Sequence, residues 1–163
     1  MYHLKPNFKS MMTLIDQTFA TRNDPGQIQV TQAQMKKLQS IHTATLSEFA
    51  NEDGPLIWIL LIPTTHKVMF DFLKGTISEA ELLKQTRPKQ NYDCIYLCSA
   101  TTLPEMRHKG ETKKLCLNAI REICKDHSIK TLFVWPFTKE GEKLAQSIAK
   151  ECNMELMIKK AIA

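Results

Sequence analysis

The chain has 163 residues, of which 43% are hydrophobic and 24% charged, a composition ordinary for one globular domain with a sizeable core. Its 22 Lys and Arg residues against 17 Asp and Glu residues give a net charge of +5, which favours an anionic ligand. Because the basic residues are dispersed, without runs or interleaved aromatic residues, the charge pattern argues against a nucleic-acid-binding protein.

The expected cell compartment follows from three features of the sequence. The longest apolar run, residues 55–63, is too short to cross a bilayer, so no membrane partner is expected. The first ten residues lack the apolar core and small-residue cleavage site of a signal peptide. Five cysteines, an odd number without a tight pairing pattern, fit reduced thiols. We therefore expect a cytoplasmic protein.

The N-terminal third is predicted to be helical. One helix is expected over residues 8–19, a turn over residues 23–26, and a second helix over residues 31–50. Thr31 is the expected N-cap of the second helix. Side chains at helical spacing would form its buried face: Met35, Leu38, Ile41, Thr45, Leu46 and Phe49.

A buried strand and two short helices are expected next. Residues 56–62 are a continuous apolar run bounded by prolines, typical of a strand buried on both faces. Thr64 or Thr65 can cap the first short helix, and Gly75 can end it. A capping box that begins at Ser78 would start the second helix.

From residue 93 onward, strands and helices alternate regularly. Strands are expected over residues 93–101, 131–135 and 154–158, with helices over residues 111–127 and 139–152 between them. Such short steps imply an α/β fold with a mixed sheet flanked by helices and a helix-rich N-terminal half. Since no long linker divides the chain, we expect a single domain, 1–163, with a mainly helical part at 1–55 and a core at 56–160.

Several common functional motifs are absent. The spacing of the five glycines excludes the glycine-rich loops of dinucleotide-binding and Walker A sites, and no G-x-S-x-G, H-E-x-x-H or C-x-x-C motif occurs. Cys94 and Cys98 would share a strand face, and His127 lies near Cys124. Buried core cysteines are the better interpretation of these residues, so no metal is expected.

The helix expected at residues 111–127 begins with cations, although the macrodipole already makes that end positive. Gly110 precedes it, where a missing Cβ allows positive φ or close approach to a ligand. The amides of the first turn form an anion site, to which Arg107, Lys109 and Lys113 add charge. The segment therefore fits a bound diphosphate, and a solvated basic helix start is the alternative.

The same segment resembles motif A of the GNAT superfamily of N-acetyltransferases. The motif reads Q/R-x-x-G-x-G/A, after a strand and a Pro-containing turn, and it opens a helix. Arg107, Gly110 and Thr112 occupy the signature positions, and Pro104 and Glu105 match the preceding turn. The order of strands and helices around the motif strengthens the resemblance.

The resemblance extends more weakly over residues 56–158 and implies the acyl-CoA N-acyltransferase fold. It also implies acetyl-CoA as co-substrate and direct attack on the thioester by an amine that the sequence does not identify. The cofactor would lie between the strand that ends at Thr102 and its neighbour at residues 131–135. Carried over position by position, the cofactor-binding residues are Ala100, Thr101, Thr102, Arg107, His108, Lys109, Gly110, Glu111, Thr112 and Lys113.

The chain departs from the family pattern at two functional positions. Thr112 stands where Gly or Ala is usual, and Ala149 stands where many members carry a Tyr that acts as general acid, with Asn153 at a following Gly position. Tyr96 and Glu105 are the remaining candidates for catalysis, although structural roles are the simpler interpretation of both. A non-catalytic CoA-binding or interaction module of the same fold is therefore the alternative, and an anion- or nucleic-acid-binding domain is a third. A homodimer stays open.

Overall fold

The computed structural model describes residues 6–22, 26–28 and 32–160 of the chain. These residues form six α-helices, five strands and one 3₁₀ turn, η2. In chain order they are α1 (Pro6–Arg22), α2 (Gln32–Ile41), β1 (Leu46–Asn51), β2 (Gly54–Thr64), α3 (His66–Leu73), α4 (Glu79–Gln85), β3 (Cys94–Thr102), η2 (Pro104–Met106), α5 (Glu111–Asp126), β4 (Thr131–Val134), α6 (Lys139–Cys152) and β5 (Glu155–Ile158).

The five strands form one mixed sheet in the order β1-β2-β3-β4-β5. β2 pairs antiparallel with β1 and with β3, whereas β4 pairs parallel with β3 and with β5. Parallel neighbours need a crossover connection, and α5 and α6 supply the two crossovers. The predicted α/β fold with a mixed sheet flanked by helices is confirmed.

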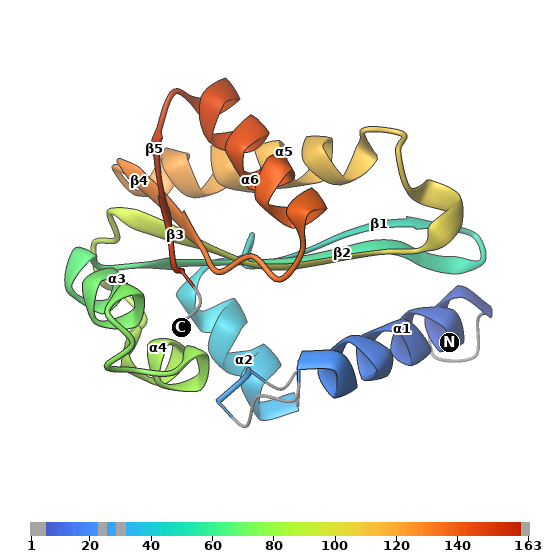
Figure 1. The fold of residues 1–163 in the computed structure, drawn as a ribbon, viewed down its shortest axis with the longest axis horizontal. Coiled ribbons are helices and arrows are strands. Elements are labelled where there is room, and N and C mark those ends of the chain that lie inside the picture. Colours follow the sequence, from blue (N-terminus) through green and yellow to red (C-terminus); the bar gives the residue numbers. More distant parts are fainter. Residues whose placement is uncertain (1–5, 23–25, 29–31, 161–163) are drawn as a thin grey trace.

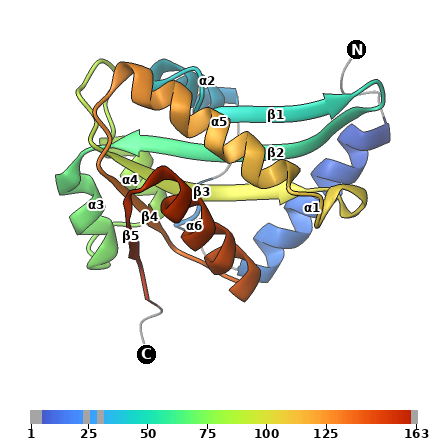
Figure 2. The ribbon, with the colours of Figure 1, turned by 90° about the horizontal axis from the view of Figure 1, so that it is seen from above.

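Helices cover both faces of the sheet. Figure 1 shows α5 and α6 on one face and α1, α2, α3 and α4 on the other, and Figure 2 shows α5 and α6 lying across the strands. β2 serves both cores, since Ile57 and Ile59 cluster with residues of α5 and α6 while Leu60 and Ile62 cluster with residues of α2, α3 and α4. Among the described residues, no helix is long and apolar enough to cross a membrane.

The predicted starts and stops of the later helices are largely confirmed. Thr65 and Ser78 accept hydrogen bonds from backbone amides in the first turns of α3 and α4, as N-caps do. Gly75 follows α3 with a φ of 81°, the left-handed conformation common just after a helix. The helix predicted over residues 111–127 is α5, and its buried residues recur at helical spacing: Cys116, Ala119, Ile120 and Ile123.

The prediction of a helix over residues 31–50 is wrong. α2 ends at Ile41, and the buried hydroxyl of Thr45 donates to the backbone oxygen of Leu38 at 2.8 Å, which satisfies a carbonyl at the helix end. Leu46 begins β1, an edge strand in which Phe49 pairs with Ile57. The part at residues 1–55 is therefore not purely helical. Thr31 and residues 23–25 of the predicted turn lie outside the described residues.

A β-bulge interrupts the pairing of β2 with β3. Leu60 pairs with Ser99 and Leu61 pairs with Leu97, so β3 contains one extra residue, Cys98. Bulges bend a strand and re-aim the side chains beyond them. In the segment beyond this bulge, Thr102 lies opposite Ile57 of β2.

Candidate functional site

The C-terminal half of β3 extends beyond the end of β4. The parallel pairing of β3 with β4 ends at Leu97 and Val134, whereas β3 continues to Thr102. Over that extension, β3 still pairs with β2 on its other side, where Ala100 lies opposite Ile59. The edge of residues 100–102 that faces away from β2 therefore has no β4 residue opposite it among the described residues.

A tight connection leads from this strand end to α5. After η2, His108 and Gly110 both adopt left-handed backbone conformations, with φ of 64° and 78°. Gly110 is the N-cap of α5, and a Cβ placed there would meet no described atom within 4 Å. Of the two roles expected for Gly110, a positive φ or close approach to a ligand, the structure shows the positive φ, and the space beside it is open.

The start of α5 presents backbone amides that no helical hydrogen bond uses. The first backbone bond of the helix runs from the amide of Lys114 to the carbonyl of Gly110 at 3.2 Å. The amides of residues 111–113 precede this bond, and Gly110 has no side chain to cap them. Because α5 has 16 residues, its dipole adds positive potential where these amides point. This helix start can therefore bind an anion.

Side chains around the connection hold the strand end and the helix start together. The hydroxyls of Thr102 and Thr112 are 2.8 Å apart, and the Arg107 Nε donates to the Thr102 carbonyl at 3.3 Å. The Thr112 hydroxyl thus contacts the strand end, an arrangement that sequence reasoning did not anticipate. Lys113 makes a 2.7 Å ion pair with Glu151 of α6, which offsets part of the positive charge.

The structure brings all the predicted cofactor-binding residues into this one connection. Ala100, Arg107, His108, Lys109 and Gly110 are exposed. The others are half-buried at the strand end or in the first turn of α5: Thr101, Thr102, Glu111, Thr112 and Lys113.

The two catalytic candidates lie in different surroundings. Tyr96 is fully buried, and its hydroxyl donates to Glu79 Oε2 at 2.6 Å. The other oxygen of Glu79 accepts from the backbone amide of Ile28 at 3.1 Å, so this hydroxyl belongs to a buried network that joins three segments. Glu105 lies in η2 and is exposed. Of the two, Glu105 is the one that solvent and ligands reach.

Ala149 and Asn153, the two positions where the resembled motif has Tyr and Gly, lie at the C-terminal end of α6. Ala149 is buried, at 4% exposure, in the core between α6 and the sheet. Asn153 caps the C-terminus of α6 with a φ of 54°, the left-handed conformation that glycine most often supplies. The end of α6 therefore has ordinary C-cap geometry, and the side chain of Ala149 cannot act as a general acid.

A second group of functional side chains lies at the opposite end of β3. The Cys94 sulfur is 3.6 Å from His66 Nδ1 and 3.4 Å from Asp93 Oδ1, and ligand atoms of the three residues lie within 4.8 Å of one another. Burial, and then the charge of Asp93, raises the pKa of the Cys94 thiol to about 12, so this thiol is not an activated nucleophile at neutral pH. Sequence reasoning missed the group because His66 and Cys94 are far apart in sequence.

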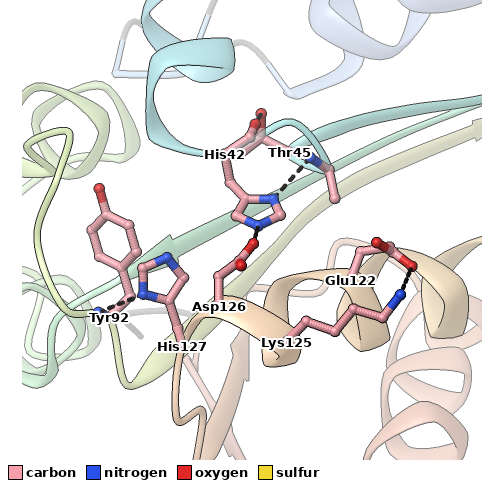
Figure 3. Close-up of polar contacts among 8 residues, drawn as sticks. His42, Thr45, Tyr92, Glu122, Lys125, Asp126 and His127 are labelled. Carbon is pink, nitrogen blue, oxygen red and sulfur yellow. Dashed lines mark hydrogen bonds and ion pairs between the residues drawn. The ribbon is translucent and has the colours of Figure 1, made fainter.

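A third cluster surrounds the C-terminal end of α5 (Figure 3). His42 Nε2 lies 2.7 Å from Asp126, and its Nδ1 accepts from the Ala44 amide, so both ring nitrogens are engaged. Burial, and then the nearby His42, lowers the pKa of His127, with Asp126 opposing the shift. A hollow of about 420 Å³ lies beside this cluster and is lined by Asn91, Tyr92, Asp93, Asp126, His127, Ser128 and Lys130.

Comparison of the chain with protein families, curated proteins and solved structures gave no match.

Proposed function

We propose that the protein is an acetyl-CoA-dependent N-acyltransferase with an acyl-CoA N-acyltransferase-like fold. One observation carries the proposal: β3 runs past β4 to Thr102 and leads through the left-handed Gly110 directly into the uncapped start of α5. This arrangement offers an extended strand edge and a helix N-terminus side by side. The two features suit the extended pantetheine arm and the diphosphate of acyl-CoA.

The diphosphate would bind to the amides of residues 111–113. Arg107 and Lys109 are exposed beside them and supply positive charge, while the pairing of Lys113 with Glu151 makes that cation a weaker contributor. The pantetheine arm would add to the edge of residues 100–102 as a further strand. In this pose the thioester lies near the point where β3 and β4 separate.

The reaction would be a direct attack of an unprotonated amine on the thioester carbonyl. A C–N bond forms and the C–S bond breaks, CoA leaves as a thiolate that takes a proton, and the amine gives up one proton. Strand amides oriented at the developing oxyanion would stabilise the tetrahedral intermediate. Glu105, as the exposed carboxylate nearest in sequence to the strand end, is the residue of this chain that we assign to receive the amine proton through water.

A non-catalytic acyl-CoA-binding module is the second candidate. The observation that favours it concerns Tyr96 and Ala149, which stands where the resembled pattern has its Tyr. Tyr96 is buried and donates its hydroxyl hydrogen bond to Glu79, and Ala149 packs in the core. Neither position can protonate the leaving thiolate. If this candidate is right, acetyl-CoA binds but no acceptor amine is acetylated.

The experiment is calorimetric titration of acetyl-CoA and CoA into the parent protein and two variants, Gly110→Asp and Gly110→Asn. Both side chains enter open space, both tolerate a left-handed φ, and they have nearly the same shape. Only Asp adds a negative charge among the amides. We expect Gly110→Asp to weaken binding at least about tenfold, or ~1.4 kcal/mol, relative to Gly110→Asn.

The outcomes separate the two candidates. Binding by the parent, selective loss in Gly110→Asp and turnover with at least one member of an amine panel would support the acyltransferase. The same binding without turnover would support the non-catalytic module. Absence of binding by the folded parent at millimolar ligand, or equal binding by the Asp and Asn variants, would overturn the cofactor site.

A further inference from the structure

We propose that His66, Asp93 and Cys94 bind a divalent cation of the zinc class at the N-terminal end of β3. This inference does not depend on the proposed acyltransferase function, because the α5 start lies beyond the other end of the same strand. It revises the sequence-based expectation of no metal, which rested on the absence of closely spaced ligand pairs.

The two distances from the Cys94 sulfur are those of a tetrahedral site, and the His66 and Asp93 ligand atoms lie within 4.8 Å of each other. Zinc bonds of about 2.3 Å to sulfur and about 2.0 Å to nitrogen or oxygen place tetrahedral ligand atoms about 3.5 Å apart. The Cys94 sulfur lies 3.6 Å from His66 Nδ1 and 3.4 Å from Asp93 Oδ1. A cation can therefore enter among the three atoms with only small side-chain movements.

Regular structure positions each of the three ligands. The antiparallel pairing sets Thr64 of β2 opposite Cys94, so His66, two residues beyond Thr64, lies next to that thiol. Thr65 caps α3 and thereby fixes His66 as the first residue of the helix. Asp93 precedes β3, and its backbone is held at both ends, since its amide donates to the Thr64 carbonyl and its carbonyl accepts from the Lys130 amide.

The chemistry of the three donors selects the cation. Thiolate and imidazole ligands suit Zn²⁺ and Co²⁺, whereas Mg²⁺ and Ca²⁺ prefer sets composed of oxygen. Cys94 is buried while His66 is exposed, so a cation can reach the group from the His66 side. On binding, the sulfur–metal bond replaces the S–H bond and one proton passes to solvent. Three protein ligands leave a fourth tetrahedral position for water.

The competing interpretation is a hydrogen-bonded group in which the Cys94 thiol donates to Asp93 and no cation binds. The test uses Co²⁺ alone as the probe, added to the metal-free full chain at neutral pH. Co²⁺ bound to a thiolate gives a charge-transfer absorption and intense tetrahedral bands. Zn²⁺ competition then gives the zinc affinity, and Mg²⁺ serves as the negative cation control.

Three variants give the test its specificity. Cys94→Ser removes the thiolate, and His66→Gln removes the imidazole from an exposed helix position where the core is not disturbed. Cys124→Ser is the matched control, since it removes an exposed thiol outside the group. We expect one thiolate-bound Co²⁺ per chain in the parent and in Cys124→Ser. Affinity should fall at least about 100-fold in Cys94→Ser and His66→Gln, since even outer-shell changes often cost 10- to 100-fold.

A stability measurement covers the case in which Cys94→Ser fails to fold. Zn²⁺ should raise the thermal midpoint of the parent and of Cys124→Ser, and His66→Gln should lose that rise, because only the folded state offers the complete site. A parent without a thiolate–Co²⁺ band would overturn the proposal. So would a folded His66→Gln variant that binds Co²⁺ and Zn²⁺ as the parent does.

Discussion

Among single side chains, the Tyr96 hydroxyl is the one whose surroundings argue most directly for a structural role. It donates to a carboxylate that is itself only 2% exposed, and its ring stacks on Phe133 with centroids 5.0 Å apart. A group this enclosed cannot meet a substrate unless the core opens. We therefore expect the Tyr96 hydroxyl to contribute to the stability of the fold.

We predict that Tyr96→Phe lowers the free energy of unfolding by about 1–3 kcal/mol, because the buried Glu79 loses a hydrogen-bond donor. Urea denaturation followed by circular dichroism measures the change. The matched control is Tyr92→Phe. The Tyr92 hydroxyl donates to the Arg87 carbonyl, so its removal leaves no buried carboxylate without a donor, and the free energy of unfolding should fall by less. An unchanged midpoint in Tyr96→Phe would contradict the structural role.

Gly110 and the pair His66 and Cys94 show which features of a site the sequence can predict and which it cannot. For Gly110, a positive φ or close approach to a ligand could be expected in advance, because a strand, a turn and a helix start surround it within a short stretch, and the structure shows the positive φ. His66 and Cys94 could not be paired in advance, since their contact depends on the register between β2 and β3. Spacing along the chain reports local geometry, and a site assembled across two strands leaves no such signal.

At the scale of elements, strongly periodic helices were predictable and the edge strand was not. α5 and α6 each bury one regular face, so their sequences carry a full helical repeat. Among the described strands, β1 pairs only with β2, and four of its six residues are exposed, so it lacks the alternation of a half-buried strand. Leu46 and Phe49 happen to be three residues apart, which imitates the spacing of a helix.

The start of α6 offers a direct test of element stability. The Thr138 hydroxyl accepts from the Gly141 amide at 3.0 Å and caps the helix. We predict that Thr138→Ala destabilises the protein by about 1 kcal/mol, and that Thr138→Ser, which keeps the oxygen, costs much less. Thermal unfolding of the two variants measures the difference. Equal losses would mean that the methyl group of Thr138, rather than its hydroxyl, stabilises this end.

At the scale of the whole molecule, β2 and β3 connect the two layers of helices. Residues of both strands belong to the core under α5 and α6 and to the core under α2, α3 and α4. Neither core is complete without these strands. We therefore expect the single domain predicted from the sequence to unfold as one cooperative unit.

Two tryptophans make this cooperativity measurable. Trp58 contacts Phe8 of α1, with ring centroids 5.9 Å apart, and Trp135 contacts Phe72 of α3 at 6.0 Å. In Trp135→Phe and Trp58→Phe, which keep one tryptophan each, we expect the emission transition to coincide with the loss of helical circular dichroism. An earlier emission change at Trp58 would mean that α1 detaches before the rest unfolds.

The extra residue in β3 makes that strand sensitive to the parity of its length. Before Cys98, Cys94 and Tyr96 belong to the core beneath α3 and α4, whereas Thr102, also at an even position, bonds to Thr112 of α5 on the other face. The bulge thus acts as a phase change in the alternation of side chains. Removing the extra residue, Cys98, would make the ladder with β2 regular and would leave Thr102 opposite Ile57, on the face of α5. Removing a second residue would shift the strand end by one position and turn its side chains to the other face. Along this strand, the loss of two residues would therefore be more damaging to the helix connection than the loss of one.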